Sequence, residues 1–290
     1  MNRKINTLYA LTITLAVGPF GTSCASSDNI VSPPDRWVLT MSDEFDGAEN
    51  TPPDPTMWTY DVGGDGWGNG QLEFNTDRVE NVSLDGQGHL RIVAREESYM
   101  GNDYTSGRIK TKVFVCGDDK DQQCGFEQKY GRFEARMKLP GGQGLWPAFW
   151  LLGADVDEVG WPDCGEIDIM EFRGQDPELT IASLHGPGYS GADSISEDFT
   201  LPDGQVFTDD FHVFAVEWDP GRITFSVDSE VYQAVTSAEV SAEGDWVYNH
   251  EFFVILNLAV GGFFVGPVGA DTVFPAEVLV DYVRIFERPQ

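Results

Sequence analysis

Three carboxylates lie close together in the segment GEIDIMEF, which spans residues 165–172. Glu166 and Asp168 are two residues apart, so a strand would point both to one face, but Glu171 lies three residues further on. A β-bulge adds one residue to a strand and would turn Glu171 to that same face. We expect Met170 in this bulge, and the spacing then predicts three acids on one face.

Three such acids could act as a glycosidase pair with a helper. On an extended strand the Cα atoms of Glu166 and Glu171 lie roughly 13–16 Å apart. Side chains leaning together on a concave strand would bring the carboxyls to about 5–5.5 Å, the separation in retaining glycosidases. Asp168 would raise the pKa of the acid catalyst or share a proton with Glu166. Spacing alone leaves two alternatives open, a solvated acidic face and a calcium site.

Aromatic and amide residues flank the acidic segment. In GGQGLWPAFWLLG, residues 141–153, Trp146 and Trp150 share one face of a predicted strand. They either fill the core or stack on sugar rings. The loop GWGNGQLEFNT, residues 66–76, either offers hydrogen-bonding amides to a neutral polysaccharide or is a glycine-rich turn. His185, in SLHGPGYSG, also has a purely structural alternative.

The elements that must position these residues are short strands separated by Gly, Asp, Asn and Pro clusters. The clearest are HLRIVARE (89–96), YGRFEARMKL (130–139), HVFAVEWD (212–219), RITFSVD (222–228), EFFVILNLAV (251–260) and VLVDYVRIFE (278–287). Convincing amphipathic helices are scarce, which favours an all-β sandwich or barrel with antiparallel pairing. A two-sheet sandwich of about 14 strands would use this length. The uncharged run 252–270 is interrupted by Asn257, Pro267 and four glycines, so it predicts a buried strand and a loop.

The charge balance is strongly acidic. The 290 residues include 18 Lys and Arg against 48 Asp and Glu, a formal net charge of −30. Such a surface repels nucleic acid and anionic membranes and excludes both as favoured partners. It suits a neutral partner, or salty water in which the self-repulsion is screened. We expect a monomer.

The first 24 residues have the pattern of an export signal. Arg3 and Lys4 precede an apolar run and the small-residue segment GTSCASS. Cys24 is also typical of a bacterial lipid-attachment site, although Gly21 stands where an aliphatic residue is usual; an ordinary secretory signal is the alternative. We expect secretion or outer-membrane anchoring, with the lipid at Cys24 as the only membrane contact.

The remaining sequence predicts a linker and one catalytic domain. Residues 25–34, ASSDNIVSPP, predict a flexible linker, and residues 35–290 a single domain. Cys116 and Cys124 flank a polar loop and could close a hairpin disulfide in an oxidising compartment. Cys164 would then be a buried free thiol. The sequence contains neither CxxC nor a His/Cys cluster, so it has no zinc signature.

Together these segments resemble glycoside hydrolase family 16, and within it the laminarinases, which are endo-acting β-1,3-glucanases. The motif WPDCGEIDIMEFRG, residues 161–174, carries the resemblance. GWGNGQLEFNT, TSGRIKT, YGRFEARMKLPGGQGLWPAFWLLG, SLHGPGYSG and LVDYVRIFE follow the family's order across residues 36–288. The ExDxxE spacing is similar to that of the laminarinase, agarase and carrageenase branches, whereas lichenases lack the extra residue.

The resemblance implies a β-jelly-roll sandwich of two antiparallel sheets with a concave substrate cleft. It implies a retaining reaction with Glu166 as nucleophile, Glu171 as general acid/base and Asp168 assisting. Six further residues match positions that line the family's cleft: Trp146, Trp150, Asn69, Arg108, His185 and, more weakly, Trp67. It implies no catalytic cofactor, but a structural Ca²⁺ on the convex side near Glu44 and Asp281.

These features predict an exported endo-1,3-β-glucanase acting on β-1,3-glucans such as laminarin, with mixed 1,3/1,4-glucans as further candidate substrates. An agarase or other β-galactan hydrolase of the same fold is the nearest alternative. A non-catalytic glucan-binding module is another, but such binders usually lose one or both glutamates, and a transglycosylase is a third. The segment 113–131 is longer than the usual connection and would reshape one end of the cleft.

Overall fold

The computed structural model describes residues 37–117 and 122–289. The chain divides into two units, residues 1–33 and 34–290, and every described residue belongs to the second. The predicted export signal, Cys24 and the linker lie outside the described residues. Within the described part, no helix has the length and apolar character needed to cross a membrane.

The larger of the two main sheets has ten strands. Eight follow one another in space as β17 (Glu230–Thr236), β16 (Arg222–Val227), β15 (His212–Asp219), β10 (Gly131–Lys138), β19 (Ala276–Glu287), β5 (Leu90–Tyr99), β6 (Asn102–Ser106) and β3 (Glu73–Asn75). Strand β1 (Val38–Asp43) pairs with β19, and β4 (Val82–Leu84) pairs with β5. The β3–β6 pair is parallel.

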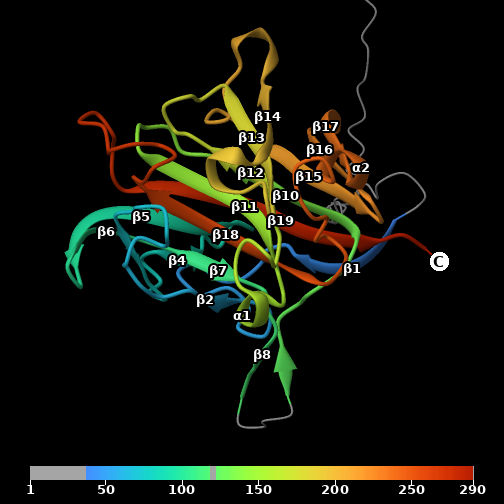
Figure 1. Cartoon of the computed structure of the whole chain (residues 1–290). Helices are drawn as coiled ribbons and strands as arrows, with labels where there is room; N and C mark the ends of the chain where they lie inside the picture. Colours follow the sequence, from blue (N-terminus) through green and yellow to red (C-terminus); the bar gives the residue numbers. More distant parts are fainter. Residues whose placement is uncertain (1–36, 118–121, 290) are drawn as a thin grey trace, which may run out of the picture. The chain divides into compact units, whose positions relative to one another are not determined.

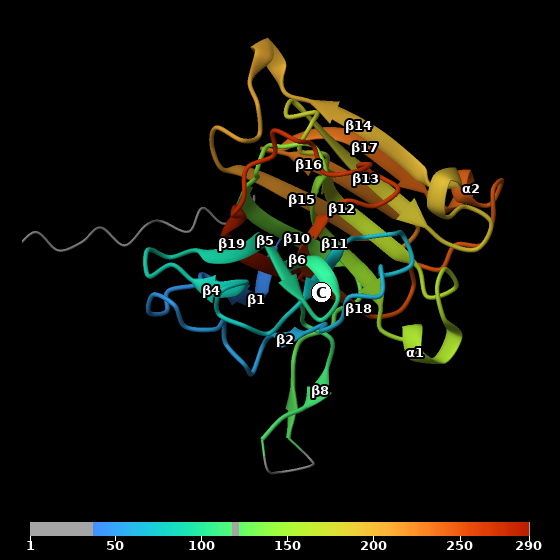
Figure 2. The same ribbon diagram turned by 90° about the vertical axis from the view of Figure 1, so that its left-hand side faces the viewer.

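The second sheet has seven strands, and all of its pairs are antiparallel. Its order is β14 (Ile195–Thr200), β13 (Leu179–His185), β12 (Glu166–Phe172), β11 (Leu145–Gly153), β18 (Phe252–Val260), β7 (Arg108–Lys110) and β2 (Thr59–Tyr60). Two views at right angles show its central strands packed against the larger sheet (Figures 1 and 2). The predicted all-β sandwich is confirmed, and the described residues contain 19 strands where about 14 were expected.

Helices are short in the described part of the chain. They are α1 (Val156–Val159), α2 (Ser237–Val240) and two 3₁₀ turns at Gly191–Asp193 and Pro202–Gly204. Helix α2 begins with a capping box between Thr236 and Glu239. Helix α1 lies in the connection between β11 and β12, just before the acidic strand.

The core between the two sheets follows the alternation of the strands. On β11, Phe149 and Leu151 are fully buried in the main core cluster, whereas Trp146 and Trp150 lie on the opposite face. All nine residues of β18 are buried, as the uncharged run predicted. Burying one such Phe or Leu side chain stabilises the fold by about 1.5–3 kcal/mol. The core therefore fixes which face of each strand is left for other uses.

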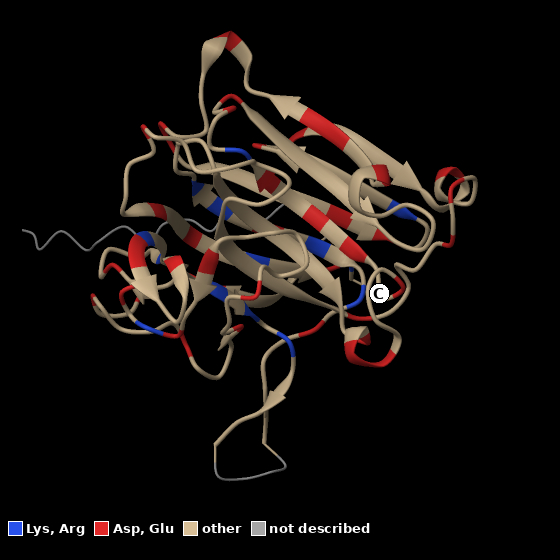
Figure 3. Cartoon of the chain, turned by 60° about the vertical axis from the view of Figure 1, so that its left-hand side comes forward, with Lys and Arg blue, Asp and Glu red and all other residues tan. Residues whose placement is uncertain are grey.

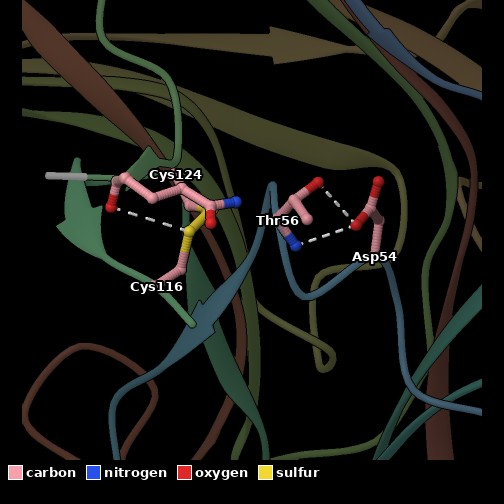
Figure 4. The surroundings of a disulfide bond; sticks show 5 residues. Asp54, Thr56, Cys116 and Cys124 are labelled. Atoms are coloured by element: carbon pink, nitrogen blue, oxygen red, sulfur yellow. Dashed lines mark hydrogen bonds between the residues drawn. A yellow bond between two sulfur atoms is a disulfide. The ribbon is translucent and has the colours of Figure 1, made fainter. Parts of the chain in front are cut away.

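The predicted disulfide between Cys116 and Cys124 is confirmed, and it closes the small hairpin of β8 (Phe114–Val115) and β9 (Gln123–Cys124) (Figure 4). This hairpin extends away from the two main sheets (Figure 1). At its base, Lys112 Nζ pairs with Asp157 Oδ2 of α1 at 2.5 Å. Cys164 is buried and free, also as predicted.

Acidic residues outnumber basic ones over most strands and loops (Figure 3). One edge strand of the seven-stranded sheet, β14, carries Glu197 and Asp198. Charges on an edge strand oppose pairing with another chain. The acidic composition therefore also protects an exposed sheet edge.

Candidate active site

Strand β12 contains the predicted bulge. Between Asp168 and Glu171, three steps along β12 match two along β13, and the register against β11 shifts at the same place. The extra residue was expected at Met170. The structure instead leaves both Ile169 and Met170 without a partner on β13, and both side chains lie in the core. Because two consecutive residues face inward, Glu171 returns to the face that carries Glu166 and Asp168.

We call this face the outer face: the side of the seven-stranded sheet that carries the three acids, opposite the core. Each terminal acid there accepts a hydrogen bond from an indole. Trp161 Nε1 donates to Glu166 Oε2 at 2.7 Å, and Trp146 Nε1 donates to Glu171 Oε1 at 3.2 Å. Trp161 is 49% exposed, so the Glu166 end of the cluster borders solvent. Both carboxyls are held in place and remain accessible.

Asp168, the central acid, is buried and contacts a histidine. Its Oδ2 lies 3.1 Å from His185 Nε2, on the neighbouring strand β13. The other ring nitrogen of His185, Nδ1, accepts the backbone N–H of Gly191 at 3.1 Å. In the neutral ring the proton is therefore on Nε2, the nitrogen that faces Asp168. His185 was predicted to line a substrate cleft, and its main contact in the structure is with this acid.

Burial is the largest cause of a raised pKa in all three acids. It raises the pKa of Glu166 to about 8, that of Glu171 to about 7, and that of Asp168 well above its usual range. Negative neighbours raise these pKa values further, while His185 lowers those of Glu166 and Glu171. The cluster therefore keeps protons near neutral pH, as an acid catalyst requires.

A row of outer-face residues crosses the sheet from the acids to Arg108. Cross-strand pairing joins Glu171 to Ala148, Ala148 to Asn257, and Asn257 to Arg108. Directly paired residues point to the same face. Trp150 Nε1 donates to Asn257 Oδ1 at 2.7 Å in this row. Trp146 and Trp150 are thus brought together with the acids.

Arg108 is held between two aromatic rings. Its guanidinium carbon lies 4.7 Å from the ring centroid of Trp67 and 4.8 Å from that of Trp150. Its Nε donates to Asp61 Oδ2 at 2.9 Å. Each cation–π contact contributes on the order of 0.5–2 kcal/mol, depending on its exposure. Three residues predicted to bind substrate therefore form one fixed cluster.

Asn69 is placed by the loop of residues 66–72. Its backbone carbonyl accepts the N–H of Phe263 at 2.9 Å, which ties this loop to the one after β18. Asn69 Oδ1 and Trp67 Nε1 are buried without a hydrogen-bond partner in the described structure. A buried polar atom without a partner costs about 1–3 kcal/mol.

Sequence reasoning missed three residues of this site. Trp161 lies in a loop before the strand, where no periodicity marks it. Ser183 Oγ donates to Glu171 Oε2 at 3.3 Å, and Asn257 binds Trp150. A signal existed for Asn257, because a polar residue within an apolar strand needs a hydrogen-bonding partner.

One group of described residues could hold a metal ion by distance alone. Ligand atoms of Glu166, Asp168 and His185 lie within 4.8 Å of one another. However, His185 uses Nδ1 to accept a hydrogen bond, so its Nε2 carries a proton and not a free lone pair. A protonated acid cluster fits these contacts better than a metal site.

Of the two residues predicted near a structural calcium, Asp281 lies on β19 of the ten-stranded sheet and Glu44 directly follows β1; both pair with arginines. Both oxygens of Glu44 accept from Arg284, at 2.9 and 2.7 Å, so this side chain does not fit as a calcium ligand. Asp281 accepts from Arg136 through Oδ2 at 2.6 Å, and only that oxygen takes part in the pair. Asp281 could still offer Oδ1, and calcium here stays a prediction.

Comparisons with known proteins agree with this architecture. The model of "Glycosyl hydrolases family 16" matches residues 79–264. A beta-glucanase from Rhodothermus marinus is 38% identical, covering 98% of this chain and 96% of that protein. The structure of an endo-beta-1,3-glucanase from Pyrococcus furiosus is 43% identical with a TM-score of 0.78, covering 88% of this chain and 95% of that one.

A third similar protein is the laminarinase catalytic domain from Thermotoga maritima. It is 41% identical with a TM-score of 0.79, covering 88% of this chain and all of that one. The family match covers more than half of the chain and includes the bulged strand with its three acids. The chain belongs to glycosyl hydrolases family 16.

Proposed function

We propose that this protein is an endo-1,3-β-glucanase that hydrolyses β-1,3-glucan with retention of configuration. The observation that carries the proposal is the bulge in β12, which puts Glu166 and Glu171 on one accessible face. A regular strand would have sent Glu171 into the core. Relatives named beta-glucanase, laminarinase and endo-1,3-beta-glucanase, at 38–43% identity, support β-1,3-glucan as the substrate.

Glu166 acts as the nucleophile in this proposal. Trp161 holds its Oε2 at the solvent-facing end of the cluster, and a fixed N–H donor favours the ionised carboxylate. Asp168 is the most deeply buried of the three acids and has a strongly raised pKa, so it keeps its proton. Burial raises the pKa of Glu166 to about 8, and two donors oppose this rise: the Trp161 N–H and a proton held on Asp168, which together stabilise the charged carboxylate that attacks the anomeric carbon.

Glu171 acts as the general acid/base. In the first step it gives its proton to the glycosidic oxygen while Glu166 forms a bond to the anomeric carbon. In the second step the ionised Glu171 takes a proton from water, whose oxygen displaces Glu166 and restores the starting state. A pKa raised to about 7 lets one carboxyl serve both steps at neutral pH.

The decisive experiment replaces each glutamate with its uncharged isostere. We expect Glu166→Gln and Glu171→Gln to lower kcat on laminarin by at least about 10³-fold, because each loses a separate chemical step. Glu230→Gln, on the exposed edge strand β17, is the matched control and should keep wild-type activity. Wild-type turnover in either catalytic variant would refute the assignment.

Two further measurements separate the alternatives. Reducing ends released from laminarin, mixed-linkage glucan and agarose distinguish a glucanase from a galactan hydrolase. Similar proteins also include a keratan-sulfate endo-1,4-beta-galactosidase at 29% identity and a beta-1,3-glucan-binding protein at 30%. Both identities are lower than the 38–43% of the glucanases and the laminarinase described above. NMR of the first product should show the β-anomer if the mechanism retains configuration.

We also propose that the protein is exported and acts as a monomer. The Cys116–Cys124 disulfide supports an oxidising compartment. Intact mass of the protein from its native host would distinguish a cleaved, secreted form from one lipidated at Cys24. Sedimentation of the purified domain would test the monomer.

A further inference from the structure

A chain of three hydroxyl groups leads from Glu171 toward the edge of the sheet. Ser183 Oγ lies 3.3 Å from Glu171 Oε2, Ser196 Oγ lies 3.1 Å from Ser183 Oγ, and Ser194 Oγ lies 2.6 Å from Ser196 Oγ. Ser183 is 3% exposed on β13, and Ser196, directly opposite it on β14, is exposed. The chain therefore links the buried side of the carboxyl to solvent.

The direction of these hydrogen bonds depends on the charge of Glu171. A hydroxyl has one proton to donate and can accept at the same time. When Glu171 is ionised, Ser183 donates to it, so Ser183 must accept from Ser196 and Ser196 from Ser194. When Glu171 is protonated on Oε2, all three bonds can reverse, and the last proton points to solvent.

The other partner of Glu171 cannot reverse. Trp146 Nε1 is only a donor, and it binds Oε1. It favours the ionised carboxylate and fixes which oxygen stays unprotonated. A general acid/base alternates between its two forms twice in each turnover. It needs one partner that fixes its position and a second that suits both forms.

We propose that Ser183, backed by Ser196 and Ser194, is a positioning residue that holds the Glu171 carboxyl in one place in both of its protonation states. This inference rests on the proposed role of Glu171 and adds the device that keeps the carboxyl aimed at the glycosidic oxygen. No proton needs to leave the site, because the proton given to the leaving group is regained from water.

Other charged groups around Glu171 do not replace this partner. Glu166 and Asp168 precede it on β12, and His185 lies on β13 nearer Asp168. Strand β11 carries no titratable residue, and Asp198 on β14 is separated from Glu171 by the paired residue Ile181. Ser183 is thus the hydroxyl that reaches Glu171 Oε2 among the described residues.

The test compares two substrates with Ser183→Ala. Cleavage of laminarin needs a proton from Glu171, whereas a 2,4-dinitrophenyl β-laminaribioside has a leaving group that departs without one. We expect kcat/KM on laminarin to fall about tenfold, the effect of one lost hydrogen bond to a charged group. On the dinitrophenyl substrate it should stay within about twofold, and KM for laminarin should change little.

The pH profile gives an independent reading. The bond from Ser183 lowers the pKa of Glu171, so its loss should raise that pKa and move the basic limb of kcat/KM upward by about 0.5–1 pH unit. Ser196→Ala, which shortens the chain at an exposed position, should give a smaller shift in the same direction. Ser98→Ala, on the exposed part of β5, is the matched control and should change nothing.

Two outcomes would overturn the proposal. Equal losses on both substrates would mean that Ser183 only supports the fold, and an unchanged profile with unchanged rates would mean that it does nothing for Glu171. A wild-type protein that cleaves neither substrate would instead refute the proposed function. Ser183→Cys, with a weaker donor of similar size, should fall between wild type and Ser183→Ala.

Discussion

Glu73 provides a sharp test of the physical reasoning outside the catalytic cluster. Its side chain has 0% exposure, and burial raises its pKa from 4.5 to about 7. Its Oε2 accepts the backbone N–H of Val260 at 2.8 Å, and Oε1 accepts from Asn75 Nδ2 at 3.3 Å. Asn75 Oδ1 is buried without a partner, so a proton on Glu73 could be donated to it after an amide flip.

The sign of the pH effect follows from the raised pKa. Below pH 4.5 both the folded and the unfolded state are protonated at this residue, and Glu73 contributes no pH dependence. Between 4.5 and about 7 the unfolded chain ionises while the folded protein keeps its proton, so rising pH favours unfolding. Each tenfold difference in proton affinity is worth about 1.4 kcal/mol. The destabilisation thus reaches about 3 kcal/mol at pH 8 and stays below about 1 kcal/mol at pH 5.

Glu73→Gln should remove this penalty. We expect the free energy of unfolding at pH 8 to rise by up to about 3 kcal/mol over wild type, and at pH 5 to lie within about 1 kcal/mol of it. Glutamine keeps the acceptor for Val260, and its amide can donate to a flipped Asn75. Urea unfolding at both pH values, with Glu230→Gln as an exposed control, measures the difference.

A stability difference for Glu73→Gln that is the same at pH 5 and pH 8 would refute the reasoning. It would mean that Glu73 titrates alike in the folded and unfolded states, and that the pairing with Asn75 and Val260 has no electrostatic consequence. The catalytic acids also have raised pKa values, but they are present in both wild type and Glu73→Gln. They therefore cancel in the stability difference between the two proteins.

Three other predictions follow from the same contacts. Trp161→Phe removes the N–H donor of Glu166, so the pKa of Glu166 should rise and the acidic limb of the pH–rate profile should move up by about 0.5–1 pH unit; an unmoved limb counts against the bond. At a net charge of −30 the melting temperature should rise between low and about 0.15 M salt, and a flat response would contradict this. If calcium binds near Asp281, added Ca²⁺ should raise the melting temperature of wild type and not of Asp281→Asn; no rise in wild type would remove the calcium prediction.

The arrangement of the strands could be predicted because each one alternates in a simple way. Ile167 and Phe172 point to the core and Glu166 points away from it, as binary patterning requires. The bulge could also be predicted, since three acids with broken spacing make little sense otherwise. Its exact place could not, because Ile169 and Met170 are both apolar and either could absorb the extra residue.

Contacts that depend on cross-strand register could not be predicted from one sequence. Arg284 binds Glu44 across 240 positions, and Arg108 lies between Trp67 and Trp150 only because β7 pairs with β18. Residue type alone does not show which strands are neighbours. The role of Ser183 was missed for the same reason, whereas Trp161 was missed because it lies in a loop without periodicity.

The inward-facing pair at the bulge has a consequence for attempts to engineer the protein. Libraries that vary only residues near the substrate would leave untouched the feature that sets the spacing of the two glutamates. Shortening β12 by one residue at Ile169 should give a regular strand in which Glu166, Asp168 and Glu171 alternate and still share the outer face, so any change in turnover would come from the altered distance between the two glutamates. Substitutions that make Ile169 or Met170 smaller or larger offer a way to change the distance between the Glu166 and Glu171 carboxyls from the core side of the sheet.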